Sequence, residues 1–104
     1  MSFLNSIFGN NNSAADLAQL VKDGAFLVDV RTPGEFADGS AKGAVNIPLD
    51  VLMQHLDKFK NKGHIVVFCR SGNRSGQAKQ ILEQNGFANV TNGGTWQNVA
   101  AFTA

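Results

Sequence analysis

A short apolar run leads into the chain's only cysteine and passes at once into a polar loop and then a helical pattern. The run covers residues 64–68, the loop begins at Cys69, and a helix is expected over 76–85 with Ser75 as its N-terminal cap. This strand–loop–helix unit places a thiol at the carboxyl end of a strand, which is where α/β sheets bind their ligands.

Other short patterns alternate in the same way along the chain. Apolar, β-rich runs predict three further strands, and stretches of helical periodicity that begin at a capping residue or a proline predict the helices. Because strands alternate with helices, we expect an α/β fold with one mostly parallel sheet and helices on both faces. The further expected elements are a helix from a Ser13 cap to Gly24, a strand over 25–30, a helical turn from Pro33, a strand over 44–48, a helix over 50–59 capped by Asp50, a strand over 89–91, a turn over 92–94 and a terminal helix over 95–102.

Length and composition fit one soluble globular domain. The chain has 104 residues, of which 43% are hydrophobic, and we assign residues 13–104 to the domain and 1–12 to an N-terminal extension. The net charge of +1 gives no reason to expect nucleic acid or a membrane as a partner. One cysteine makes no internal disulfide, and the N-terminus lacks the basic and apolar regions of an export signal. We therefore expect a cytoplasmic protein.

Two weaker features predict no further site. Apolar side chains within residues 3–8 are expected to pack on the domain's own sheet edge rather than on a membrane or a partner. His55 and His64 have neither a second cysteine nor an acidic cluster to join them, so no metal site is expected. No cofactor is expected either.

Cys69 has the neighbours of a reactive thiol. A cysteine at the end of an apolar run is often only a small buried side chain. Here Arg70, Arg74 and a helix amino terminus follow it, and their charges and N–H groups favour the thiolate and can hold an anion. Gly72 and Asn73 tolerate the left-handed backbone that a loop curling around one atom needs. We therefore interpret Cys69 as a nucleophile.

A second loop carries charged residues to the same edge of the sheet. Asp29, Arg31 and Glu35 lie at and after the end of the strand expected over 25–30. We interpret Asp29 as a buried strand-end carboxylate that accepts hydrogen bonds from loop N–H groups, with a catalytic acid as the less favoured alternative.

Three parts of the chain resemble the signature motifs of rhodanese domains. In order along the chain they are residues 29–36 with 43–48, the active-site loop 67–75, and Asn89-Val90 followed by Gly93-Gly94. The resemblance implies a rhodanese-like single domain with a five-stranded, mostly parallel sheet. It also implies a thiosulfate sulfurtransferase that works through a persulfide on Cys69. The sulfane sulfur would come from thiosulfate or a persulfide donor and pass to cyanide or a thiol, including a protein thiol.

The resemblance also implies roles for single residues. Cys69 becomes the nucleophile and persulfide carrier, the backbone N–H groups of residues 70–74 its cradle, and Arg70 and Arg74 the charges that meet an anionic donor. The candidate site comprises Cys69 as the catalytic residue, Arg70, Ser71, Gly72, Asn73 and Arg74 as the substrate-binding cradle, and Asp29, Arg31, Glu35 and Ser75 as supporting residues.

Two positions depart from the family pattern. Ser40 stands where a histidine is usual, at a place that is generally peripheral to the site. Trp96 follows the glycine pair sooner than usual, so the last helix is expected to pack differently.

Two other classes of protein remain alternatives. A small cysteine-dependent phosphatase or arsenate reductase uses the same electrostatics, but its loop has one residue more than the four between Cys69 and Arg74. A non-enzymatic sulfur-carrier or partner-binding module is the second alternative; modules that merely bind partners usually lack the cysteine, which is present here. A persulfide relay to another protein keeps it, and the sequence does not separate such a relay from an enzyme for small molecules.

Overall fold

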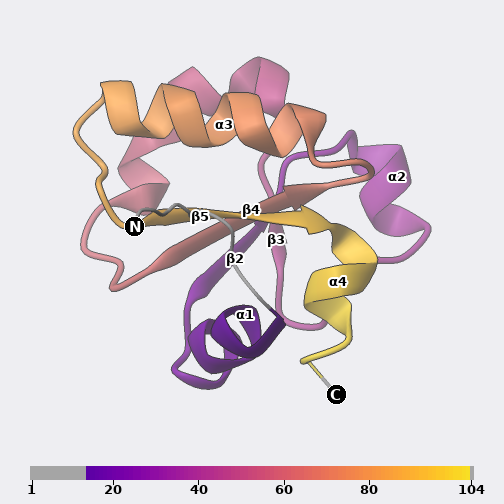
Figure 1. The fold of residues 1–104 in the computed structure, drawn as a ribbon. Coiled ribbons are helices and arrows are strands. Elements are labelled where there is room, and N and C mark those ends of the chain that lie inside the picture. Colours follow the sequence, from indigo (N-terminus) through magenta and orange to yellow (C-terminus); the bar gives the residue numbers. More distant parts are fainter. Residues whose placement is uncertain (1–13, 104) are drawn as a thin grey trace.

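The computed structural model describes residues 14–103 and shows four parallel strands in one sheet, in the order β3-β2-β4-β5 (Figure 1). The strands are β2 (Phe26–Asp29), β3 (Val45–Asn46), β4 (Ile65–Cys69) and β5 (Val90–Thr95). The parallel sheet is as predicted. The expectation of five strands is wrong for the described residues, because they contain only the four β-rich runs that the sequence shows.

Helices cover both faces of this sheet (Figure 1). Leu82 of α3 and Leu52 of η1 belong to the core on one face, and Leu17 of α1 and Val99 of α4 to the core on the other. The helices are α1 (Ala14–Lys22), α2 (Pro33–Ala37), the 3-10 helix η1 (Leu49–Phe59), α3 (Asn73–Gln84) and α4 (Trp96–Ala100).

Alternate residues of β4 supply the two cores, since successive side chains of a strand point to opposite faces. Val66 and Phe68 pack toward α1 and α4, whereas Ile65, Val67 and Cys69 pack toward α3. The alternation therefore places the thiol on the face that carries the helix following the loop.

α3 begins earlier than predicted, at Asn73, and Ser75 is not its cap. The N-cap is Gly72, whose φ of 97° lies in the left-handed region that glycine adopts without strain. Ser75 is buried in the first turn, where its hydroxyl bonds the side chain of Asn92 on β5. A contact between two elements thus takes up the side chain that the local pattern assigned to capping.

The segment predicted as a helix over 50–59 is a 3-10 helix with a kink. No side chain caps it, so Asp50 is not a cap, and the backbone of His55 leaves the helical region (φ −127°, ψ 26°). Leu52 and Phe59 are buried and pack in the core. Because a 3-10 helix rises more per residue than an α-helix, the segment can reach between these two anchors over a longer distance.

The last strand is longer than predicted, and the glycine pair belongs to it rather than to a turn. β5 runs through Gly93 and Gly94 to Thr95, which then caps α4 with its side chain. A methyl group on Gly93 would lie 2.8 Å from Val99 Cγ2 and 3.0 Å from Val66 Cγ1. The first glycine therefore permits close packing of three elements, which the sequence pattern does not distinguish from a turn.

Other predicted bounds differ at their ends, where strand pairing or helical bonding stops before the sequence pattern does. The strands predicted over 25–30 and 44–48 are Phe26–Asp29 and Val45–Asn46, and the terminal helix predicted to reach 102 ends at Ala100. The Ser13 cap, the extension over 1–12 and the packing of residues 3–8 lie outside the described residues and stay predictions.

Candidate active site

Cys69 ends β4, and its side chain is fully buried. Its Sγ accepts a hydrogen bond from the backbone N–H of Gly72 at 3.0 Å and lies 3.4 Å from the Ser75 hydroxyl. α3 begins directly after Gly72, so the amino-terminal end of this helix lies next to the sulfur. The positive end of the helix dipole favours negative charge at this position.

These surroundings lower the pKa of the Cys69 thiol below its ordinary value. Burial of the sulfur is the largest single influence and acts in the opposite direction, because it disfavours the charged thiolate. Hydrogen bonds from the Ser75 hydroxyl and from the backbone N–H groups of Ser75, Ser71 and Gly72 lower the pKa and together prevail. Since the thiolate is the nucleophilic form of cysteine, the site favours reactivity.

The predicted cradle contributes unequally to the sulfur's contacts. The N–H groups of Ser71 and Gly72 act on the sulfur, but the N–H of Asn73 bonds the Ser71 hydroxyl at 3.5 Å. Asn73 is exposed as the first residue of α3. The sulfur is therefore held mainly by the N–H groups of Ser71 and Gly72 and by Ser75.

Asn92 of β5 joins this loop, and sequence reasoning did not find it. Its Oδ1 accepts the Ser75 hydroxyl at 2.7 Å and the Gly94 N–H at 2.9 Å, and its Nδ2 donates to the Gly72 carbonyl at 3.1 Å. The prediction of a turn over 92–94 hid this contact. A strand through Asn92 beside β4 would have placed its side chain next to the loop.

Asp29 and Arg31 form a buried ion pair at the end of β2. The guanidinium bonds both carboxylate oxygens, with Nη2 2.6 Å from Oδ2, and the Arg31 backbone N–H donates to Oδ1 at 3.0 Å. Hydrogen bonding to Asp29 raises the pKa of Arg31 above its ordinary value. These contacts are those of the favoured interpretation, a strand-end carboxylate that orders its loop.

Glu35 and Arg74 join the two loops. The Arg74 guanidinium donates to both carboxylate oxygens of Glu35, at 2.7 and 3.0 Å. Glu35 also accepts from the Thr32 N–H in the capping box of α2. The bond to Arg74 and, after it, the bond to Thr32 lower the pKa of Glu35 to about 2. The Arg74 guanidinium is thus paired with a carboxylate of this chain, whereas the sequence predicts that this guanidinium is free to bind the anionic group of a donor.

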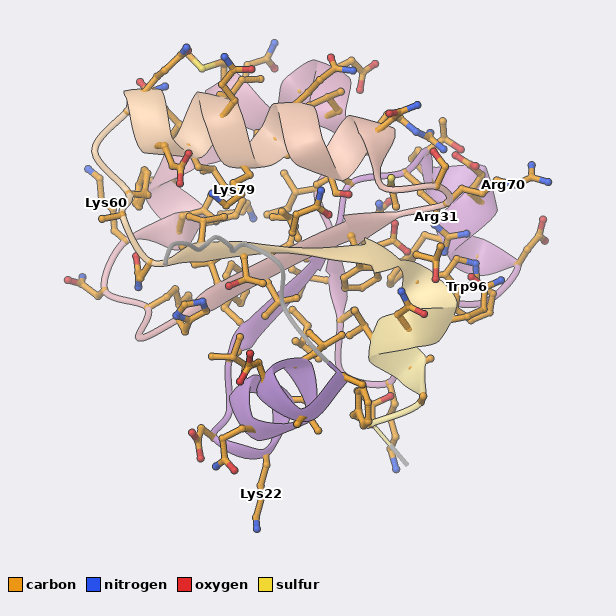
Figure 2. The ribbon with its side chains drawn as sticks, viewed as in Figure 1. Lys22, Arg31, Lys60, Arg70, Lys79 and Trp96 are labelled. Carbon is orange, nitrogen blue, oxygen red and sulfur yellow. The ribbon has the colours of Figure 1, made fainter. Side chains whose placement is uncertain are left out.

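A cavity of about 300 Å³ opens beside the cysteine loop. Arg70, the residue after Cys69, is exposed and lines it. Trp96 lines it as well, and its ring centroid lies 5.2 Å from the Cζ atom of Arg31. Figure 2 shows Arg31, Arg70 and Trp96 together at one end of the molecule. The full lining is Arg31, Glu35, Asp38, Gly39, Arg70, Trp96 and Gln97.

The sequence that forms this site matches a known family. The model of the rhodanese-like domain matches residues 13–95. The chain belongs to the rhodanese-like domain family.

Individual relatives agree with this membership. The uncharacterized protein YqhL of Bacillus subtilis is 40% identical over 68 residues, which cover 65% of this chain and 54% of that protein. The thiosulfate sulfurtransferase PspE of Escherichia coli is 36% identical over 75 residues, 70% of this chain and 72% of that protein. The structure of the human single-domain sulfurtransferase TSTD1 is similar, with a TM-score of 0.70, 30% identity, and coverage of 81% of this chain and 88% of that chain.

The two departures from the rhodanese pattern both lie near the Asp29–Arg31 pair. The Ser40 hydroxyl donates to Asp29 Oδ2 at 2.7 Å, so the serine supplies a hydrogen-bond donor to the buried carboxylate. Trp96 is the first residue of α4 and packs against Arg31. Both residues therefore support the end of β2 in this rhodanese-like domain.

Metal-ligating side chains and apolar helices form no further site of their own in the part of the chain that the structure describes. No three side chains among its His, Cys, Asp and Glu residues gather into a group that could hold a metal ion. The His64 ring lies 2.8 Å from the Thr91 hydroxyl, and burial lowers its pKa. None of the helices over residues 14–103 has the length and apolar character needed to cross a membrane.

Proposed function

We propose that this rhodanese-like protein is a sulfurtransferase that carries sulfane sulfur as a persulfide on Cys69. One observation carries the proposal: the chain's single thiol lies next to the amino-terminal end of α3 and accepts the Gly72 N–H at 3.0 Å. The lowered pKa of Cys69 supports a nucleophilic sulfur. The names of PspE and TSTD1 support the same class of reaction.

The first half of the reaction loads the cysteine with sulfur. The Cys69 thiolate attacks the outer sulfur of thiosulfate and forms a new S–S bond. The bond between that outer sulfur and the sulfonate sulfur breaks, and sulfite leaves with its electron pair. The persulfide anion that results lies at the same helix start, where N–H groups favour negative charge.

The second half of the reaction removes the outer sulfur from Cys69. A thiolate or cyanide attacks the outer sulfur of the persulfide, the S–S bond to Cys69 breaks, and the Cys69 thiolate returns. The products are a persulfide of the acceptor or thiocyanate. The acceptor thiol can belong to a small molecule or to a protein, and the cycle needs no cofactor. We propose a cytoplasmic location, because a chain with a single cysteine makes no internal disulfide and fits a reducing compartment.

The two arginines of the loop take different roles in this proposal. Arg70 directly follows the nucleophile in the chain and is exposed at the cavity, so we assign it the anionic end of the donor. Arg74 is bonded to Glu35 and holds the loop against α2. Its charge still interacts with that of Cys69, and it therefore contributes to the field at the sulfur.

The alternative of a phosphatase or arsenate reductase has less support. Such an enzyme needs an arginine free to contact the oxygens of a tetrahedral anion, and the Arg74 guanidinium is bonded to Glu35 through both terminal nitrogens. The loop is also one residue shorter than in those enzymes. We expect the protein to leave an aryl phosphate essentially untouched.

Intact-mass measurement after incubation with thiosulfate tests the proposal. We expect the wild-type chain to gain one sulfur atom, and cyanide to remove it as thiocyanate. Cys69→Ser is the matched control, because it nearly keeps the volume of the side chain and removes the nucleophile; it should fold and gain nothing. A wild-type protein that gains no sulfur from thiosulfate or from a persulfide donor would refute the proposal, as would a Cys69→Ser variant that gains as much as wild type.

A further inference from the structure

We propose that Asn92 is a positioning residue for Cys69: its amide oxygen accepts the proton of the Ser75 hydroxyl while Cys69 is a thiol, and releases that proton to the sulfur when the sulfur becomes charged. The proposal deepens the function proposed above and rests on it for its place in the catalytic cycle. Its geometric basis is independent, because it consists of contacts between β5, the cysteine loop and α3.

The orientation of the Asn92 amide is fixed by two backbone groups. The Gly94 N–H requires an acceptor and the Gly72 carbonyl requires a donor, at 2.9 and 3.1 Å from the amide oxygen and nitrogen. Turning the amide over would place the Gly94 N–H opposite the donor Nδ2 and the Gly72 carbonyl opposite the acceptor Oδ1, so both hydrogen bonds would be lost. The amide oxygen therefore points at Ser75 whatever the charge on the sulfur.

The Ser75 hydroxyl has one proton and two acceptors for it. Asn92 Oδ1 lies 2.7 Å from the hydroxyl oxygen, and Cys69 Sγ lies 3.4 Å from it. While Cys69 is a thiol, the hydroxyl donates to Asn92 and accepts the thiol S–H. When Cys69 loses its proton to solvent, the hydroxyl turns and donates to the thiolate, and Asn92 Oδ1 keeps its bond from Gly94.

In the proposed cycle, the acceptor of the Ser75 hydroxyl changes with the charge on the sulfur of Cys69. In the persulfide, the negative charge lies on the outer sulfur and the sulfur of Cys69 is neutral. The Ser75 hydroxyl then returns to Asn92, with its proton retained throughout. Asn92 therefore competes with the thiolate for the hydroxyl, which raises the energy of the free thiolate relative to the loaded persulfide.

A titration of the thiol separates this role from simple support of the loop. If Asn92 only held the loop in shape, its loss would loosen the N–H contacts of the sulfur and raise the pKa of Cys69. If Asn92 competes for the hydroxyl, Asn92→Ala removes the hydrogen bond that Ser75 must give up when it turns to the thiolate. The pKa then falls by up to about one unit, the effect of one neutral hydrogen bond. The two roles predict opposite signs.

The thiolate absorbance in the far ultraviolet gives the pKa without any reagent having to reach the buried sulfur. The chain contains no tyrosine, so no phenolate overlaps the signal, and Cys69→Ser provides the blank. Ser75→Ala should raise the pKa. In the double variant with Ser75→Ala, Asn92→Ala should have no further lowering effect, because the hydroxyl that it frees is gone. Arg74, whose charge interacts with that of Cys69, and its ion-pair partner Glu35 are unchanged in every variant.

Asn98→Ala is the matched control, because it removes an exposed asparagine side chain from the neighbouring α4; the pKa of Cys69 should stay as in wild type. Asn92→Leu keeps more of the volume and serves if the alanine variant unfolds. A pKa that rises or stays constant in the Asn92 variants overturns the proposal, as does a fall that persists without Ser75.

The titration uses no sulfur substrate, so its outcome is separate from the mass measurement. Failure to gain sulfur from a donor refutes the proposed function while the titration still reports on Asn92. Failure of the titration refutes the role of Asn92 while the mass measurement still reports on sulfur transfer.

Discussion

Gly93→Ala should destabilise the fold by packing alone. The added methyl carbon would lie 2.8 Å from Val99 Cγ2 and 3.0 Å from Val66 Cγ1, against an ordinary van der Waals separation of 3.4–4 Å. Both valines are fully buried, one in α4 and one in β4, so neither side chain can move into solvent. The strand β5 or one of its neighbours must shift instead.

Overpacking of this kind costs about 1–3 kcal/mol in free energy of unfolding. For a domain of this size, that loss corresponds to a fall in Tm of about 5–20 °C. Urea unfolding of both proteins measures the difference directly. Gly63→Ala is the control, because a methyl group there meets nothing within 4 Å, and it should leave the stability nearly unchanged.

A second variant identifies the cause. Val99→Ala removes one of the two clashing methyl groups, so it should cost less stability in the Gly93→Ala background than in wild type. A Gly93→Ala protein as stable as wild type, or equal costs of Val99→Ala in both backgrounds, would refute the packing explanation.

Two further variants test the charged residues. Arg70→Ala should raise KM for thiosulfate by about ten- to a hundredfold, the effect of losing one arginine–oxyanion contact, and should raise KM for an uncharged persulfide donor much less. Steady-state kinetics with both donors measure this difference. Equal increases in KM for the two donors would indicate a structural role for Arg70. Glu35→Gln tests the bond to Arg74 through pH. Because the folded-state pKa of Glu35 is about 2, below its ordinary 4.5, the carboxylate stabilises the fold above about pH 4.5 and loses this effect as the pH falls toward 2. The difference in unfolding free energy between wild type and Glu35→Gln should thus be constant above that pH and shrink below it, and a difference that grows in acid would contradict the pairing.

Features encoded by neighbouring residues could be predicted from the sequence. The apolar run before Cys69 and the glycine after it mark a strand and a loop, and the structure has both. Asp29 ends the neighbouring strand, and Arg31 and Glu35 follow it. The parallel pairing of β2 with β4 brings their loop beside the cysteine loop, where Glu35 pairs with Arg74.

Features that depend on distant partners could not be predicted. Ser75 looks like a helix cap in its own surroundings, but its partner Asn92 lies 17 residues further along the chain. Arg74 looks free to bind an anion, but its partner Glu35 lies 39 residues earlier. The role of Gly93 depends on two valines from other elements. In each case a local pattern fits the residue, and a partner brought near by the fold decides its conformation.

The contact between Ser75 and Asn92 also has a consequence for the order in which the surroundings of Cys69 form during folding. During synthesis Cys69 and Ser75 leave the ribosome before Asn92, and the parallel strand that carries Asn92 must wait for α3 to cross the sheet. Contacts that close such a long loop form late, because the chain entropy is lost before the contact is gained. A partly folded chain in which α3 has formed before β5 pairs therefore has the local contacts of Cys69 with Gly72 and Ser75, and the competing acceptor Asn92 is added only when β5 joins the sheet.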